Sequence, residues 1–141
     1  MIVGDASPLI TFGRLGLLEL VFTLVGVVNV LEAVMAEVTA AGPRPGKDEV
    51  LIAVANGRIA VLEQPAAALA QRLASRLDTG EAEAIALAAT LRLPLLIDER
   101  KGRAVAAQLG VHVVGTLGLL DEVERAGFRM SAALRAELLH R

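Results

Sequence analysis

Five short aliphatic runs, separated by longer stretches with helical spacing, constrain the fold of this 141-residue chain more than any other feature. The runs are rich in Val, Ile and Leu and mostly lack the polar alternation of a half-exposed strand, which is typical of strands buried on both faces of a parallel sheet. They fall at 1–5, 26–30, 58–62, 94–98 and 111–114. Helices that connect parallel strands by right-handed crossovers cover both faces of the sheet. We therefore expect a single three-layer α/β/α domain over residues 1–141, with a mainly parallel five-stranded sheet.

The stretches between these runs have the start and stop residues of helices. Ser7 is a candidate N-cap for a first helix, in which apolar residues recur at helical spacing from Leu9 through Phe12 and Leu15 to Leu18. Gly57 is expected to end a later helix in the left-handed conformation. Further helices are predicted at 31–41, 47–56, 65–77, 81–92, 100–109, 117–126 and 131–140.

The composition excludes several kinds of functional site. The chain has no Cys, so it cannot form disulfides or zinc–thiolate sites, and its two His leave little scope for a His-based triad or a multi-His metal site. Three Phe are its only aromatic residues, which are too few for a surface that stacks successive bases. The formal net charge of −2 gives no basic field, so a nucleic acid would have to meet a local basic patch. Any bound metal ion must be held by oxygen.

The sequence has no recognisable secretion or membrane segment. Its most apolar stretch runs from Leu15 to Leu31 but contains Glu19, and the uncharged part is shorter than the roughly 20 residues that a membrane span requires. The absence of Cys fits a reducing compartment. We expect a cytoplasmic protein with no membrane segment.

Acidic residues follow two of the expected strands. Asp5 follows the first run and Asp98 the fourth, and the carboxyl ends of parallel strands are where ligands gather. The two would lie side by side if these strands are neighbours. Asp5 could be a metal ligand or the N-cap of the next helix. Asp98 could likewise cap the helix that follows it, and Glu99 is the rival ligand, because a one-residue shift in the strand end exchanges the two side chains.

Two further acids lie on expected helices. Glu37 shares its helix with Glu32, and either could be an ordinary solvated charge. Asp78 and Glu81 match a capping box in which Glu81 reaches back to the N-cap, so the cap and ligand interpretations of Glu81 stand as equals. Crowded carboxylates repel one another, and Mg²⁺ or Mn²⁺ would relieve that repulsion. The candidate ligands are Asp5, Glu37, Glu81 and Asp98, with Glu99 as the alternative to Asp98.

Segments along almost the whole chain resemble the PIN domain. These segments are 3–10 (VGDASPLI), the helix around Glu37, 78–88 (DTGEAEAIALA) and 96–103 (LIDERKGR). Together with 115–120 (GTLGLL), they resemble more narrowly a prokaryotic PIN-like branch described as nucleic-acid-binding. The resemblance implies a ribonuclease with a parallel sheet flanked by helices. It places Asp5, Glu37, Glu81 and Asp98 in the acidic site and Ser7 where a hydroxyl assists the first acid, although Glu81 stands where an Asp is usual.

The activity implied by the resemblance is metal-assisted hydrolysis of RNA. Carboxylates would hold one or two Mg²⁺ or Mn²⁺ ions that activate water for attack on a phosphodiester. Arg100, Lys101 and Arg103 offer the cations that such a substrate needs near an acidic site. Ser7 is expected to help bind the nucleic acid. The alternative is a non-catalytic PIN-like module that binds RNA or a protein.

The resemblance also implies protein partners. Many PIN domains are the toxin half of a toxin–antitoxin pair, so a type II toxin with a cognate antitoxin is expected. Such toxins commonly dimerise, and the helix predicted at 117–126 offers Leu119, Leu120 and Val123 as an apolar surface that one domain does not fully cover. A homodimer is therefore expected as well.

Overall fold

A five-stranded parallel sheet forms the centre of the molecule. The computed structural model describes residues 1–40, 42, 45–127, 132–133 and 136. The strands are β1 (Ile2–Gly4), β2 (Val28–Leu31), β3 (Ile59–Leu62), β4 (Leu95–Leu96) and β5 (Val113–Val114). They lie in the order β3-β2-β1-β4-β5 with every neighbouring pair parallel. The winding therefore reverses at β1, where β4 is its second neighbour, and the predicted fold class is confirmed.

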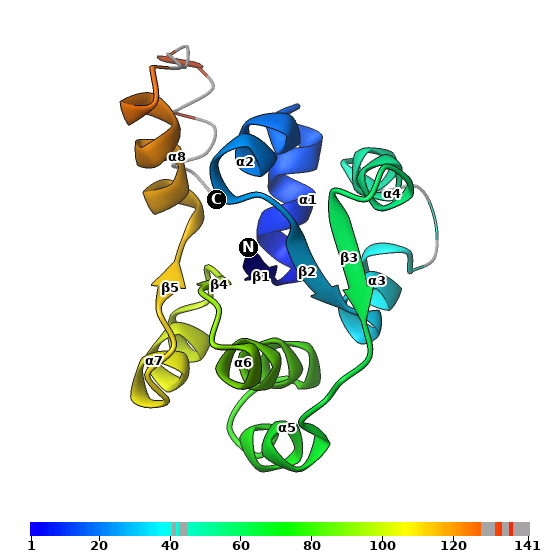
Figure 1. Cartoon of the computed structure of the whole chain (residues 1–141), viewed down its shortest axis with the longest axis vertical. Coiled ribbons are helices and arrows are strands. Elements are labelled where there is room, and N and C mark those ends of the chain that lie inside the picture. The colour runs from blue at the N-terminus through cyan, green and yellow to red at the C-terminus, as the bar shows by residue number, and fades with distance from the viewer. Residues whose placement is uncertain (41, 43–44, 128–131, 134–135, 137–141) are drawn as a thin grey trace.

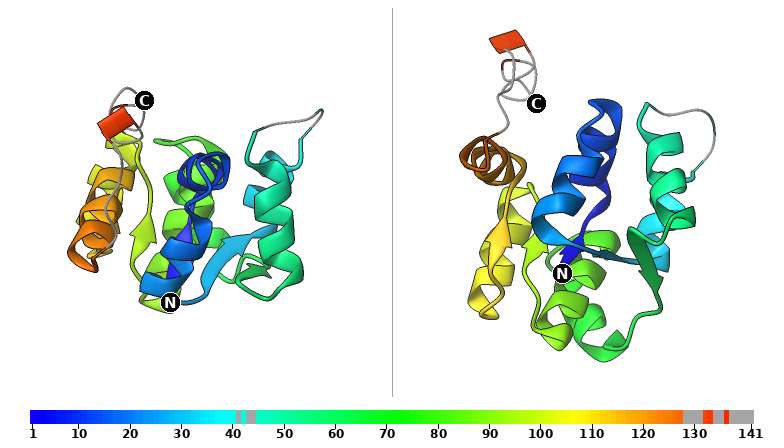
Figure 2. Two further views of the ribbon diagram at one scale, coloured as in Figure 1. Left: turned by 90° about the horizontal axis from the view of Figure 1, so that it is seen from above. Right: turned by 45° about the horizontal axis from the view of Figure 1, so that its top comes forward.

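Helices cover both faces of this sheet. They are α1 (Ala6–Arg14), α2 (Leu18–Val25), α3 (Glu32–Val38), α4 (Lys47–Ala55), α5 (Ala67–Leu73), α6 (Thr79–Leu91), α7 (Arg100–Gln108) and α8 (Thr116–Arg125). In Figure 1, α5, α6 and α7 lie on one side of the sheet, and α1, α2 and α4 lie on the other. The two further views in Figure 2 show the same layers. Helix α6 contacts β1, β2 and β4, so it covers the middle of the sheet.

The small side chains of α6 explain how it fits between the sheet and α5. Its buried residues include Ala82, Ala84, Ala86 and Ala88, with Ile85 fully buried among them. Ala side chains allow close packing on both sides, and a helix that is apolar nearly all round is one that is covered on more than one side. Helix α5 packs on α6 and provides that second cover.

The first predicted helix is two helices in the structure. The chain turns after α1 at Gly16, whose φ of +71° is in the left-handed region that favours glycine, and α2 begins at Leu18. Ser7 is not an N-cap, because α1 begins at Ala6 with Asp5 in the cap position and Ser7 within the first turn. The apolar spacing continues across the break and conceals it in the sequence.

The remaining predicted elements form with shifted ends. Helix α5 ends at Leu73, four residues before the predicted end. Gly57 has φ +76° just after α4, as predicted. The helix predicted at 131–140 lies outside the described residues apart from 132–133 and 136. The predicted apolar surface of α8 is wrong, because Leu119, Leu120 and Val123 are at most 3% exposed within the single chain.

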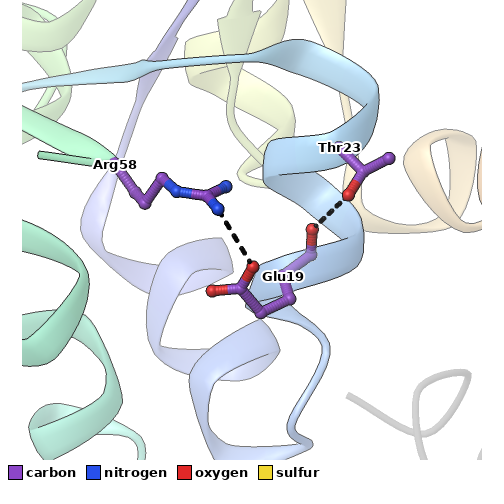
Figure 3. A network of polar contacts seen from close by, with 3 residues as sticks. All are labelled: Glu19, Thr23 and Arg58. Carbon is purple, nitrogen blue, oxygen red and sulfur yellow. Dashed lines mark hydrogen bonds and ion pairs between the residues drawn. The ribbon is translucent and has the colours of Figure 1, made fainter. Parts of the chain in front are cut away.

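A polar contact ties α2 to the beginning of β3. Arg58 Nη2 lies 3.6 Å from Glu19 Oε2, and the guanidinium stands 5.9 Å from the centre of the Phe22 ring. Thr23 Oγ1 donates a hydrogen bond to the Glu19 carbonyl on the same helix (Figure 3). Both members of the ion pair are exposed, so its contribution to stability is about 0–1 kcal/mol. Within the part of the chain that the structure describes, none of the helices has the length and apolar character needed to span a membrane.

Candidate active site

The carboxyl ends of β1 and β4 open into a cleft of about 360 Å³. Strand β1 pairs directly with β4, with Gly4 opposite Leu96, so the residues that follow each strand meet at one edge of the sheet. The cleft is lined by Asp5, Ser7, Glu37, Asp78, Glu81, Asp98 and Glu99. The structure thus brings together all five predicted acids, and adds Asp78 as a sixth.

Asp5 is buried in this acidic surrounding with only 9% of its surface exposed. Its side chain makes no capping hydrogen bond to α1, although it occupies the N-cap position. Burial raises its pKa to about 6, the Ala6 N–H opposes that rise, and the negative charges of Glu37, Asp78 and Asp98 add to it. The charged form of Asp5 is therefore unfavourable where it stands, unless a cation joins it.

Glu37 reaches the same cleft from α3. Its Oε1 lies 3.7 Å from the position that a Cβ on Gly80 would take, which places Glu37 beside the first turn of α6. Glu32 is not among the residues that line the cleft. The structure therefore distinguishes the two acids of this helix, which are equivalent in the sequence pattern.

Glu81 is held in the first turn of α6 and points toward α7. Asp78 is the N-cap of α6 and accepts a hydrogen bond from the Glu81 N–H at 2.8 Å, which is one half of the predicted capping box. The Glu81 side chain points elsewhere: its Oε2 lies 2.9 Å from where a Cβ on Gly102 would stand. This oxygen is buried and receives no hydrogen bond from the described residues.

The protonation of Glu81 follows from its neighbours. Burial, followed by hydrogen bonding with the Asp78 and Glu99 carboxyl groups, raises the pKa of Glu81 to about 9. A carboxyl group with that pKa is protonated at neutral pH and donates to an acidic neighbour. The pKa of Asp78 is lowered mainly by this hydrogen bond. A cation bound here would replace the proton of Glu81 as the positive charge between these carboxyl groups.

Asp98 is oriented by a single residue at the beginning of α8. Its Oδ1 accepts a hydrogen bond from the Thr116 N–H at 2.7 Å, and its Oδ2 accepts one from the Thr116 hydroxyl at 2.5 Å. Gly115 permits this approach, since a Cβ there would stand 3.3 Å from Asp98 Oδ1 and 3.1 Å from Arg103 Nη1. Asp98 does not cap α7, so the capping role that the sequence allows for it is wrong.

Glu99 is the residue that caps α7. Its Oε1 accepts from the Lys101 N–H at 3.0 Å, and its Oε2 accepts from the Gly102 N–H at 2.7 Å. These two backbone hydrogen bonds, the one from Gly102 first, lower the pKa of Glu99. Both Asp98 and Glu99 therefore line the cleft with their oxygens engaged at the N-termini of different helices.

The donor set of the cleft fits a hard divalent cation, although its side chains are not assembled around one. Among the residues that the structure describes, no three Asp, Glu or His side chains are arranged to hold a metal ion. Asp98 and Glu99 each use both carboxylate oxygens in hydrogen bonds at helix N-termini. The groups that line the cleft offer oxygen atoms only, which are the ligands that Mg²⁺ and Mn²⁺ prefer. Binding would draw the carboxylates together and release a proton.

The predicted nucleic-acid-binding residues occupy different places. Ser7 lines the acidic cleft. Lys101 lines a second cavity beside it. Arg103 lies against Gly115 near Asp98, and Arg100 is exposed at the beginning of α7 without lining either cavity. The predicted patch is thus three cations on one helix turn, of which only Lys101 lines a described cavity.

Two residues of the site are not among those predicted from the sequence. The sequence pattern indicates Asp78 only as a helix cap, and it does not single out Thr116. The first polar side chain after the fifth aliphatic run, separated from it only by Gly115, would have indicated Thr116, because the carboxyl ends of all parallel strands share one edge of the sheet. The same rule applied to helix caps at that edge would have indicated Asp78.

The fold and the cleft together define an α/β domain with six carboxyl groups at the carboxyl edge of its parallel sheet. The family described as PIN domain matches residues 1–140, and the chain belongs to this family, as the sequence resemblance predicted. PIN domains are generally nucleases. A comparison with curated proteins finds no match.

Proposed function

We propose that this protein is a metal-dependent ribonuclease that hydrolyses phosphodiester bonds of RNA. The observation that carries the proposal is the crowding of carboxyl groups in one cleft whose described lining contains no basic residue. Two of these groups, Asp5 and Glu81, have raised pKa values because burial and acidic neighbours disfavour their charged forms. Strongly perturbed acids that converge in a cleft are typical of functional sites.

Asp5, Glu37, Glu81 and Asp98 would hold Mg²⁺ or Mn²⁺. When bound, such a cation would supply positive charge that offsets the acids and the phosphodiester, and it would lower the pKa of a water molecule for attack on phosphorus. Thr116 fixes the direction of the Asp98 carboxylate through two hydrogen bonds. Glu81 gives up its proton when it becomes a ligand. Ser7 lines the cleft, and its hydroxyl would donate to a phosphate oxygen of the substrate.

A second candidate function is a PIN-like module that binds RNA or a protein without cleaving RNA. It is favoured by the lack, among the described residues, of any three acids already arranged around a metal position. We further propose that the protein is the toxin of a type II toxin–antitoxin pair, with a cognate antitoxin and a homodimer as partners, as the sequence resemblance implies.

The test is cleavage of single-stranded RNA by the purified full-length protein with Mn²⁺, with Mg²⁺ and with EDTA. The wild type should cleave only with metal, and Asp5→Asn and Asp98→Asn should lose cleavage without unfolding. Asp48→Asn is the matched control, since Asp48 is an acid on α4 outside the cleft. RNA binding without metal-dependent cleavage would instead establish the non-catalytic module.

A further inference from the structure

A second cavity adjoins the acidic cleft and carries two basic residues. It measures about 340 Å³ and is lined by Ser75, Arg76, Leu77, Asp78, Glu81, Glu99 and Lys101. Asp78, Glu81 and Glu99 line both cavities. The two cavities therefore adjoin one another at the N-termini of α6 and α7.

The two basic residues come from separate elements. Arg76 lies in the connection between α5 and α6, and Lys101 lies in the first turn of α7. Arg76 Nη2 donates to Gln108 Oε1 at 3.4 Å, so the guanidinium extends toward the last residue of α7. Both basic side chains are exposed. A guanidinium has five N–H donors, so one bond to Gln108 leaves others for an external oxygen ligand.

Two of the three acids that line the second cavity, Asp78 and Glu99, are engaged at helix N-termini. Asp78 accepts from the Glu81 N–H, and Glu99 accepts from the N–H groups of Lys101 and Gly102. The positive end of each helix dipole offsets part of these negative charges. Arg76 and Lys101 are thus the groups of the second cavity that remain for an anion, whereas the described lining of the acidic cleft has no basic residue.

We propose that the Arg76–Lys101 cavity binds the phosphate group of the RNA strand that neighbours the phosphate being cleaved. This inference rests on the proposed ribonuclease function. Successive phosphates of one strand are joined through a single sugar. A strand whose scissile phosphate lies over the acidic cleft therefore places its next phosphate near the adjoining Arg76–Lys101 cavity. Arg and Lys are the side chains that most often contact such phosphates. The strand then leaves the cleft between the α5–α6 connection and the first turn of α7.

The experiment compares Arg76→Gln/Lys101→Gln with the wild type and with a matched control, Arg72→Gln/Arg125→Gln. The control removes the same charge from exposed positions that line neither cavity. Binding of a fluorescein-labelled single-stranded RNA of about 20 nucleotides is followed by anisotropy in EDTA across a salt series. Steady-state cleavage with Mn²⁺ gives KM and kcat separately.

The double variant should bind RNA about 10-fold more weakly and show a correspondingly higher KM, with kcat within about twofold of the wild type. Its plot of log K against log salt should become shallower by about 0.7 for each phosphate that the variant no longer neutralises, while the control keeps the wild-type slope. If the wild type cleaves RNA and the double variant matches the control in KM and in slope, the phosphate site is overturned and the ribonuclease function stands. The two cations would then be assigned to a protein contact. A wild type without metal-dependent cleavage would overturn both.

Discussion

Replacing Asp5 by Asn should stabilise the metal-free protein at neutral pH while it removes a proposed metal ligand. Asn has nearly the same shape as Asp and keeps a side-chain oxygen, so the packing around the side chain is preserved. Raising the pKa of Asp5 from 3.8 to about 6 means that its ionisation costs the folded state about 3 kcal/mol relative to the unfolded chain. The substitution removes that cost.

The pH dependence gives the prediction its sign. Between pH 3.8 and about 6 the folded protein holds a proton on Asp5 that the unfolded chain has released, so the stability of the wild type relative to the variant falls as the pH rises. Below pH 3.8 the two proteins should have similar free energies of unfolding, apart from the change in shape. Above about pH 6 the variant should be more stable by about 3 kcal/mol, or roughly 5–10 °C in Tm.

The assay is urea unfolding in EDTA from about pH 3.5 to about pH 8, with Asp48→Asn as the charge-matched control outside the cleft. The control should differ from the wild type by no more than about 0.5 kcal/mol at every pH. Added Mn²⁺ should reverse the order, because it binds the folded wild type through Asp5 and the variant lacks that ligand. A variant that is less stable than the wild type at neutral pH, or a difference that does not change with pH, would refute the reasoning.

Three further predictions concern the groups around Asp5. Glu81→Gln should keep its melting temperature and lose cleavage, because Asp78 caps α6 through the Glu81 backbone N–H, which Gln retains; a lower Tm with an unchanged rate would restore the capping role. Gly102→Ala should change the free energy of unfolding by less than about 1 kcal/mol, because the higher helix propensity of Ala offsets the cost of moving the Glu81 and Ile97 side chains. It should weaken Mn²⁺ binding in calorimetry, since the added Cβ would stand 2.9 Å from Glu81 Oε2. An unchanged Mn²⁺ affinity would count against Glu81 as a ligand. Thr116→Val should lower the free energy of unfolding by about 1 kcal/mol and weaken Mn²⁺ binding, because it removes the hydrogen bond from the hydroxyl to Asp98. Thr116→Ser keeps a hydroxyl and should restore both the stability and the affinity. Equal Mn²⁺ affinity in the Val and Ser variants would remove Thr116 from the site.

The sheet and the acidic cleft could be predicted because they depend on local patterns. Aliphatic runs mark the strands, and an acid directly after a run lies at the carboxyl edge whatever the details of packing. The sequence predicted that Asp5 and Asp98 lie side by side if the first and fourth strands are neighbours, and the β1–β4 pairing meets that condition. The metal-binding roles of the acids stay predictions.

What could not be predicted depends on contacts between distant segments or on a shift of one residue. The bond between Asp98 and Thr116 requires β4 to pair with β5 in a particular register. The sequence allowed Asp98 to cap α7, whereas Glu99 is the cap in the structure, because the helix begins at Arg100. The break at Gly16 is concealed by apolar residues that keep helical spacing on both sides of it.

The dependence of Asp98 on Thr116 has a consequence for the newly made chain. The acidic cleft draws on residues from Asp5 to Glu99, and the Asp98 carboxylate is fixed by the first residue of α8. During synthesis the residue that orients Asp98 follows Asp5 by more than a hundred residues. A nascent chain therefore holds all six carboxyl groups of the cleft before it can orient them, and the site is completed only when α8 begins to form.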